Sequence, residues 1–488
     1  MSGELGIDLP RPKRPFKNGS PNSEGKDRPE FHFDFTGSNG FSRKAVEQWP
    51  IDGFADQEIG VDLGILASQA ARPLSAAETD WVQLAAAIYA ADRFANRRPG
   101  RAVGQTFWRR SIHLKVPVLD PTLWNKAMPS ILSALSFLTD DDWTIHFIER
   151  RRRRGEEDQL HLHGGSNNQP AWVCLFSGGL DSLAGFKRLS SLPHTRGLLV
   201  SGWTHERLDL GQERIVSHLR ATHCQPFEWL PVRYGFGKIV NSAGMESSQR
   251  SRGWIHVALG LAAVVASNRH TLDVGENGIG AFNLPTELSQ TGSHTSRAMH
   301  PVFLRRIAQA ASVVFDRELH VRQTAVFETK GELLSRTLRP SDSGLAALTF
   351  SCEIFPNYHS KQPQCGVCPS CLVRRASLHS SGIEGPEHLY SLDVKTQHIP
   401  AKKALGLIKM ERFTRRLARG FHPMSAADSA MWEYPEAGSY FKEAADSISM
   451  NFDDFLTKLR RTHYNFVQEW EDFASNVPSL RQHRRSAA

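Results

Sequence analysis

The sequence predicts an α/β protein built on a parallel sheet, with helices on both faces of the sheet. Three observations lead to this fold. Apolar strand-like segments alternate with amphipathic helical segments between residues 172 and 315, and such alternation requires right-handed crossovers and a parallel sheet. A glycine pair joins the first of these strands directly to a helix. Four clustered cysteines after the last helix indicate a metal-binding segment at the carboxyl-terminal end of the same domain.

The chain of 488 residues is long enough for two or three domains. Its hydrophobic share of 40% and charged share of 23% are ordinary for a globular protein. No apolar run approaches the ~20 residues of a membrane-spanning helix, and the first residues lack the apolar core of a signal peptide. We therefore expect a cytoplasmic protein with no membrane partner. The net charge of +8 does not by itself predict a nucleic-acid partner, because the arginine run 150–154 lies beside acidic residues and is typical of a solvated linker.

The first third of the chain predicts a polar segment and an accessory module. Residues 1–40 are expected to be disordered, and residues 41–154 are expected to form an α/β module with its tryptophans in the core. The predicted elements are a helix from Leu74 to about Arg98, a strand over 112–118, a helix opened by Asp120-Pro121, and a strand over 143–148.

A polar linker is expected over residues 155–170, before a main domain of residues 171–385. The strands of this domain are expected over 172–176, 197–203, 227–232 and 271–274, and its helices over 182–189, 212–223, 254–267 and 301–315. Residues 386–488 predict a helical carboxyl-terminal extension whose last helix covers 452–473.

The strand-to-helix junction Ser177-Gly178-Gly179-Leu180-Asp181-Ser182 is the most informative segment of the chain. Glycines there permit positive φ and let backbone N–H groups approach an anion, and a helix N-terminus favours a phosphate. The Asp181 carboxylate would repel a phosphate unless Mg²⁺ lay between them, so it predicts Mg²⁺ binding. A tight turn capped by Asp181 or Ser182 is the simpler interpretation, but the whole string at the start of an alternating α/β domain favours a nucleotide.

This string resembles the pyrophosphate loop of the N-type ATP pyrophosphatases, enzymes that cleave ATP to AMP and pyrophosphate while adenylating a substrate. Within that superfamily, residues 172–383 most resemble 7-cyano-7-deazaguanine synthase. The segment Phe327-Glu-Thr-Lys330-Gly-Glu332 is similar to that family's Thr-Lys-x-Glu segment. The resemblance implies a Rossmann-like fold of the adenine nucleotide alpha hydrolase type and a catalytic role for Lys330 on the leaving pyrophosphate, the alternative being a surface lysine. It further implies catalytic roles for Ser177 and Asp181 and ATP binding by Ser177, Gly178, Gly179, Leu180, Asp181 and Ser182.

The four cysteines, Cys352, Cys365, Cys368 and Cys371, include a C-x₂-C-x₂-C run. Such spacing can place three thiolates on one turn, with Cys352 completing a tetrahedron. A closed all-sulfur set suits structural Zn²⁺, and an iron–sulfur cluster is the alternative. The run continues as Cys371-x-x-Arg374, which fits the synthase family closely, and that resemblance implies zinc.

Five further residues are candidates for the ligand pocket. Arg250 and Arg252 precede an apolar helix, either as a solvated cap or, as in many superfamily members, as groups beside the nucleotide. Glu276 and Asn277 end a strand at the sheet edge that carries the phosphate loop. They resemble the family's Gly-x-Asn, although a plain turn is the alternative. Arg297 lies in segment 292–300, which departs from the family's Tyr-Pro-Asp-Cys-Arg. Glu276, Asn277 and Arg297 are the expected substrate-binding residues.

Together these features predict an ATP-dependent carbon–nitrogen ligase. A carboxylate of the 7-carboxy-7-deazaguanine type would be adenylated by ATP and then captured by an amine. Residues 112–124 and 137–143 diffusely resemble synthase-like proteins of bacterial antiviral defence operons, which implies an amine carried by a partner protein. The alternatives are the ordinary synthase reaction with ammonia, an RNA-modifying enzyme, and a nucleotide-binding regulatory subunit. A homo-oligomer is left open. If the N-terminal module only binds the partner protein that carries the amine, deletion of residues 1–150 should leave adenylation intact and abolish transfer to the amine.

Overall fold

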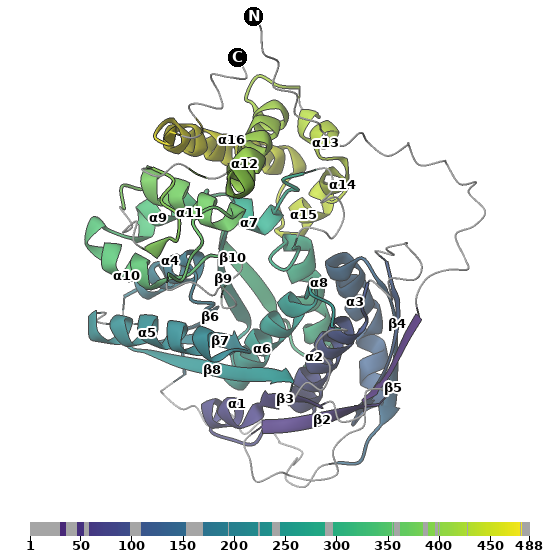
Figure 1. Ribbon diagram of the computed structural model, residues 1–488. Helices are drawn as coiled ribbons and strands as arrows, with labels where there is room; N and C mark the ends of the chain where they lie inside the picture. Colours follow the sequence, from purple (N-terminus) through teal and green to yellow (C-terminus); the bar gives the residue numbers. More distant parts are fainter. Residues whose placement is uncertain are drawn as a thin grey trace, which may run out of the picture.

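A mixed sheet of ten strands runs through the protein in the order β10-β9-β6-β7-β8-β3-β2-β1-β4-β5 (Figure 1). Most neighbouring strands are parallel, which confirms the α/β class. The computed structural model describes residues 30–35, 46–52, 58–97, 109–152, 169–193, 195–222, 225–236, 245–287, 296–353, 355, 362–383, 389–395, 399, 401–426, 428–478 and 480. The strands are β1 (Glu30–Phe35), β2 (Val46–Asp52), β3 (Glu58–Asp62), β4 (Ser111–Val118), β5 (Asp142–Glu149), β6 (Trp172–Leu175), β7 (Gly197–Trp203), β8 (Phe227–Phe236), β9 (Thr271–Asn277) and β10 (His320–Ala325).

Five strands form the parallel half of the sheet that the main domain was expected to contain. β8, β7, β6, β9 and β10 lie side by side in that order, and each pair is parallel. All four strands expected from the pattern are present. β10 was missed because it lies at the sheet edge and buries only Ala325 fully, so its sequence lacks an apolar run. The strand order reverses between β6 and β9, and open α/β sheets bind ligands at such a switch point.

The N-terminal segments continue this sheet and do not form a separate domain. β3 pairs antiparallel with β8, and β2 and β1 then lead to the parallel strands β4 and β5. The expectation that residues 1–40 are disordered is wrong for Glu30–Phe35, whose alternating Phe33 and Phe35 are buried in the core. Most of the expected linker 155–170 lies outside the described residues. Deletion of residues 1–150 would remove five strands of one sheet, so it cannot be expected to spare adenylation.

The sheet wraps around an inner layer of helices α2, α3, α6 and α8 (Figure 1), and its half formed by β6–β10 carries helices on both faces. The other face carries α4 and α5, with α9 and α10 packed against them. The helices are α1 (Leu63–Ala70), α2 (Ala76–Phe94), α3 (Pro121–Thr139), α4 (Leu180–Ser190), α5 (Glu206–Thr222), α6 (Arg252–Ala266), α7 (Gly278–Phe282), α8 (Pro301–Val314), α9 (Lys330–Thr337), α10 (Ser343–Leu348), α11 (Pro369–Ser380), α12 (Ala401–Phe421), α13 (Ser429–Glu433), α14 (Pro435–Gly438), α15 (Phe441–Ser447) and α16 (Phe452–Ser475). No helix among the described residues is long and apolar enough to span a membrane.

The core joins the N-terminal helices to the main domain. The Trp81 ring on α2 lies 6.3 Å from that of Trp124 on α3 and 6.4 Å from that of Trp254 on α6, and all three side chains are buried. The Trp81 indole N–H donates to the Ala258 carbonyl across this boundary. The expected core role of the N-terminal tryptophans is confirmed for Trp81, Trp124 and Trp143, whereas Trp108 lies outside the described residues.

The carboxyl-terminal extension is helical, as expected, and α16 reaches back to the main domain. It packs on α11 and α12. Its Glu469 accepts a hydrogen bond from Thr329, the N-cap residue of α9, and Asn465 donates to Glu332 at 2.9 Å. The extension therefore contacts the helix that begins with Lys330.

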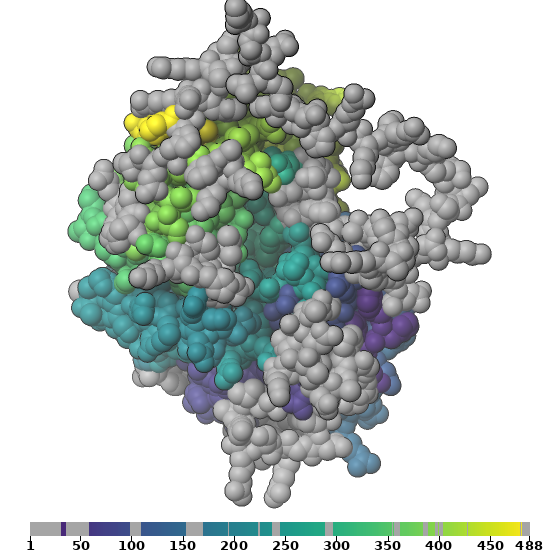
Figure 2. All heavy atoms as spheres, in the orientation of Figure 1, coloured from purple at the N-terminus to yellow at the C-terminus, as the bar shows by residue number. Residues whose placement is uncertain are grey.

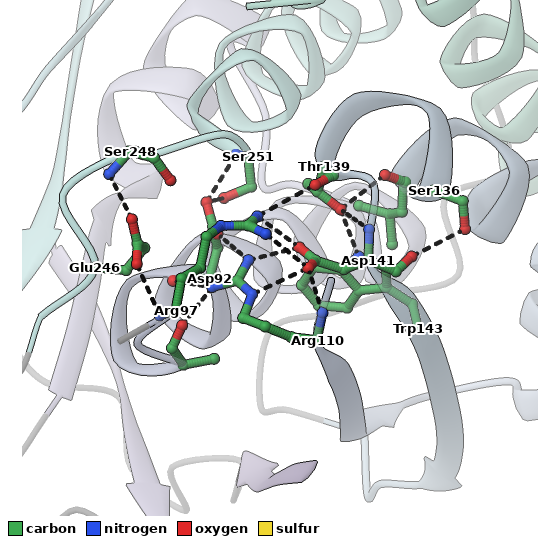
Figure 3. Close-up of polar contacts among 12 residues, drawn as sticks. Asp92, Arg97, Arg110, Ser136, Thr139, Asp141, Trp143, Glu246, Ser248 and Ser251 are labelled. Carbon is green, nitrogen blue, oxygen red and sulfur yellow. Dashed lines mark hydrogen bonds and ion pairs between the residues drawn. The ribbon is translucent and has the colours of Figure 1, made fainter. Parts of the chain in front are cut away.

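A buried cluster of charges lies where α2 meets the main domain (Figure 3). Arg110 is fully buried, and its guanidinium contacts Asp92 at 2.7 Å and Asp141 at 2.6 Å. Burial opposes ionisation of Asp92, but Arg110 and Ser251 outweigh this cost and lower its pKa. The same Asp92 accepts from the backbone N–H and hydroxyl of Ser251, each at 2.8 Å. Arg97 pairs with Asp141, and its backbone N–H donates to Glu246. The cluster thus fixes residues 246–251, the segment before α6, to the N-terminal module.

Replacing Arg110 with Met should destabilise the protein by about 3–5 kcal/mol, because two buried carboxylates lose their cation. The free energy of unfolding in urea measures this effect. The neighbouring Arg109→Met is a matched control. Arg109 is half exposed and pairs with the partly exposed Asp142, so its loss should cost less than about 1 kcal/mol. Equal effects of the two substitutions would contradict the structural role assigned to the cluster.

Candidate functional site

A pocket of about 680 Å³ opens at the switch point between β6 and β9. In Figure 2 the teal surface of the middle of the chain lies next to the green surface of the segments that follow it. The lining combines residues of the phosphate loop with residues from distant parts of the chain. Among them are Ser177, Gly179, Asp181, Ser182, Glu276, Arg252, Tyr89, Arg93, Gln249, Tyr234, His256, Phe350 and Cys352.

The loop Ser177–Ser182 that was expected to bind phosphate is a tight turn that requires glycine at one position. Gly178 adopts φ +84°, and a Cβ atom there would lie 2.6 Å from the Phe350 ring, so only glycine fits. The Gln212 side chain donates to the Ser177 carbonyl at 3.1 Å, and the Ser182 hydroxyl donates to the Gly179 carbonyl at 2.9 Å. Leu180 is fully buried in the core, so its side chain anchors the loop. The loop therefore presents Ser177, Gly179, Asp181 and Ser182 to the pocket.

The carboxylate of Asp181, in the loop, contacts the ammonium group of Lys330 and the side-chain amide of Asn277. Its Oδ2 lies 2.8 Å from Lys330 Nζ, and its Oδ1 accepts from Asn277 Nδ2 at 2.9 Å. The structure thus brings together three predicted residues, of which Asp181 and Lys330 are 149 positions apart. Lys330 contacts Asp181 but does not itself line the pocket. Burial, and then the neighbouring Asp181 carboxylate, raise the pKa of Glu276 to about 8. Glu276 is therefore largely protonated at neutral pH.

Another part of the lining was not expected from the sequence. Tyr89 and Arg93 come from α2, Tyr234 from β8, and Gln249 from the segment before α6. The Tyr89 hydroxyl donates to Gln249 Oε1 at 3.2 Å. The sequence around Tyr89 and Arg93 does not indicate a function, because the apolar periodicity of α2 is typical of an ordinary core helix. The sequence contained no indication that it would reach the phosphate loop.

The four predicted metal ligands converge. The Sγ atoms of Cys352, Cys365, Cys368 and Cys371 all lie within 4.8 Å of one another. Sulfurs of a tetrahedral zinc site are about 3.8 Å apart, given Zn–S distances of ~2.3 Å, and the Sγ atoms of Cys365 and Cys371 are 3.9 Å apart. The cluster can therefore hold a metal ion such as zinc.

The cysteine cluster is connected to the pocket through residues 346–352. Arg374 is buried and donates to the Thr349 hydroxyl at 2.7 Å and to the Ala346 carbonyl at 2.7 Å. Phe350 covers Gly178, and its N–H donates to the Gly178 carbonyl at 3.2 Å. A metal bound by Cys352 would thus fix the segment that packs over the phosphate loop. Arg374, the arginine of the C-x₂-C-x₂-C-x₂-R string, therefore has a structural role, because it connects the cysteine segment to residues 346–349.

Two predicted pocket residues lie elsewhere. Arg252 lines the pocket, but Arg250, two positions earlier, does not. Arg250 lies close to the charges of the buried cluster. Burial and the charge of Arg97 lower the pKa of Arg250 to about 10. Arg297 also lies outside the lining. It donates to the Phe137 carbonyl at 3.0 Å and lies over the rings of Phe137 and Tyr440, between α3 and the carboxyl-terminal helices.

Comparison with known proteins adds no assignment. A scan of the sequence against protein-family models finds no match, and a search of curated proteins finds no significant match either. The site is therefore interpreted from its own residues and geometry.

Purified protein should contain about one zinc ion per chain, because four thiolates close one tetrahedral site. Cys368→Ser should lose most of this zinc and lower the melting temperature, since the metal ties Cys352 to the C-x₂-C-x₂-C turn. Metal analysis by mass spectrometry and a thermal melt measure the two effects. Cys174→Ala is the control, because Cys174 is a buried residue of β6 and its loss should leave the zinc content unchanged. Iron, or no metal in folded protein, would contradict the zinc assignment.

Proposed function

We propose that the protein adenylates a small carboxylate with ATP and transfers the activated acyl group to an amine. One observation carries this proposal: a glycine loop at the N-terminus of a helix opens into a pocket at the switch point of a parallel sheet, and a lysine pairs with the aspartate of that loop. Within the pocket, the exposed hydroxyl of Ser177 and the N-terminus of α4 suit a polyphosphate. Asp181 and the loop would hold ATP with its Mg²⁺, which supplies charge neutralisation.

The first step would form an acyl-adenylate. A carboxylate oxygen attacks the α-phosphorus of ATP, the bond to the bridging oxygen breaks, and pyrophosphate leaves. Lys330 and the N–H groups of the loop offset the charge that develops on pyrophosphate. Lys330 and Asp181 form an ion pair in the structure. When MgATP binds, the polyphosphate would become a partner for Lys330 and the Mg²⁺ ion a partner for Asp181. In the second step the amine nitrogen attacks the acyl carbon, AMP leaves, and the amine gives up a proton.

The resemblance of the loop and of the Lys330 segment to 7-cyano-7-deazaguanine synthase favours 7-carboxy-7-deazaguanine as the carboxylate. Zinc would be structural, because a four-thiolate site leaves no open position. The diffuse resemblance to antiviral defence proteins favours an amine on a partner protein. The ordinary synthase reaction with ammonia remains the alternative, together with an RNA-modifying activity.

Asp181→Asn should lower Mg²⁺-dependent pyrophosphate release about 100-fold or more, because a single charged group that acts on the transition state is worth about that much. A coupled pyrophosphate assay with MgATP and 7-carboxy-7-deazaguanine measures the rate. Asp446→Asn, on the exposed side of α15, should retain the wild-type rate. A fully active Asp181→Asn variant would refute the role given to the loop.

The amine acceptor can be identified by mass spectrometry. Wild-type protein with MgATP, the carboxylate and a candidate partner protein should produce a partner whose mass increases by the deazaguanine acyl group, with one AMP formed per adduct. The same mixture with ammonium in place of the partner should yield little free nitrile. Efficient nitrile formation from ammonium, with an unmodified partner, would instead establish the ordinary synthase reaction.

A further inference from the structure

Helix α2, which precedes the main domain, contributes to a part of the pocket lining whose chemistry differs from that of the loop Ser177–Ser182. Tyr89 of α2 and Gln249 of the segment before α6 meet at this part of the lining, next to Tyr234 and His256. We propose that Tyr89 and Gln249 form a recognition subsite for a purine-type base. This inference rests on the proposed function, in which two purine-type bases take part: the adenine of ATP and the deazaguanine of the carboxylate.

The subsite places an oriented amide next to a buried aromatic cluster at the pocket wall. The Tyr89 ring lies parallel to Phe236 with centroids 5.8 Å apart and meets Tyr234 edge-on at 5.4 Å. The Tyr89 hydroxyl binds Gln249 Oε1 and so orients the amide. Among the residues that the structure describes, no group accepts from Gln249 Nε2, so this nitrogen can donate to a ligand. Aromatic rings and a fixed amide donor suit a planar base with hydrogen-bonding edges.

The side chains of Tyr89, Gln249, Tyr234 and His256 are uncharged at neutral pH, and the cations Arg93 and Arg252 line the pocket beside them. Burial, reinforced by the charge of Arg252, lowers the pKa of His256 to about 3, so its imidazole is uncharged at neutral pH. The Tyr234 hydroxyl lies 2.8 Å from His256 Nε2, and burial raises the pKa of both Tyr234 and Tyr89. The uncharged donors and acceptors of Tyr89 and Gln249 suit the hydrogen-bonding edge of an uncharged base.

Backbone geometry gives an independent indication. Gln249 has φ +47°, a left-handed conformation that costs energy for any residue with a side chain and that recurs at ligand sites. The buried charge cluster holds it there, because Asp92 binds Ser251 and Glu246 binds Arg97 and Ser248 on either side. Glycine would adopt the same conformation at no steric cost. A glutamine at this position is therefore consistent with a function of its side chain.

Two substitutions test the subsite while preserving the fold. Tyr89→Phe keeps the ring that packs on Phe236 but removes the hydroxyl that orients the amide. Gln249→Gly removes the amide and suits the backbone conformation, so its melting temperature should not fall. Binding is measured by calorimetry with three probes in the presence of Mg²⁺: α,β-methylene-ATP, 7-carboxy-7-deazaguanine and inorganic tripolyphosphate. Each variant should bind one of the two base-containing probes about fivefold to tenfold more weakly and bind tripolyphosphate as the wild type does.

The base-containing probe that loses affinity identifies which base occupies the subsite, and either result supports the inference. Tyr464→Phe on α16 is the matched control and should bind all three probes normally. Unchanged affinity in both variants, or an equal loss for tripolyphosphate, would overturn the subsite. A wild-type protein that shows base-selective binding but releases no pyrophosphate would refute the proposed reaction alone. A wild-type protein that binds neither base would refute both.

Discussion

The guanidinium of Arg110, buried between Asp92 and Asp141, is the interaction on which the arrangement of the site depends. It joins α2 to the start of β4 and to the turn before β5. Through the second oxygen of Asp92 it also fixes Ser251, at the start of α6. Charges buried in this way tolerate little change, because each one left without its partner is costly. The positions of Gln249 and Arg252 in the pocket therefore depend on residues of the N-terminal module.

The site is supported from both ends of the chain. The N-terminal module supplies Tyr89 and Arg93 to the lining. At the other end, Glu469 of the carboxyl-terminal helix accepts from Thr329, next to Lys330. Burial raises the pKa of Glu469 to about 7, so its charge varies near neutral pH. The segments that the family resemblance does not cover are thus parts of the same folded unit, which explains why a simple division into an enzyme and a docking module does not describe this protein.

Charge in the pocket is balanced in a way that suits an anionic ligand. Asp181 is neutralised by Lys330, and Glu276 holds its proton up to about pH 8. Arg93 and Arg252 face the same space. The carboxylates next to the loop therefore add little negative field at neutral pH, whereas two free acids there would repel a polyphosphate. This balance comes from residues of five different elements, α2, α4, α6, α9 and β9.

Local patterns in the sequence were enough to predict the α/β class, most strands and helices of residues 171–315, the glycine turn between β6 and α4, and the convergence of the four cysteines. Each of these depends on neighbouring residues: apolar periodicity, a glycine pair before a helix, or a C-x₂-C-x₂-C turn. The tertiary structure alone decided that β3 joins β8 and makes one sheet, that Asp181 pairs with Lys330, and that Arg252 reaches the pocket while Arg250 does not. It also placed Arg297 between α3 and the carboxyl-terminal helices and brought Tyr89 to Gln249. Such contacts join residues far apart in the chain, and they follow from strand order and helix direction, which local periodicity does not encode.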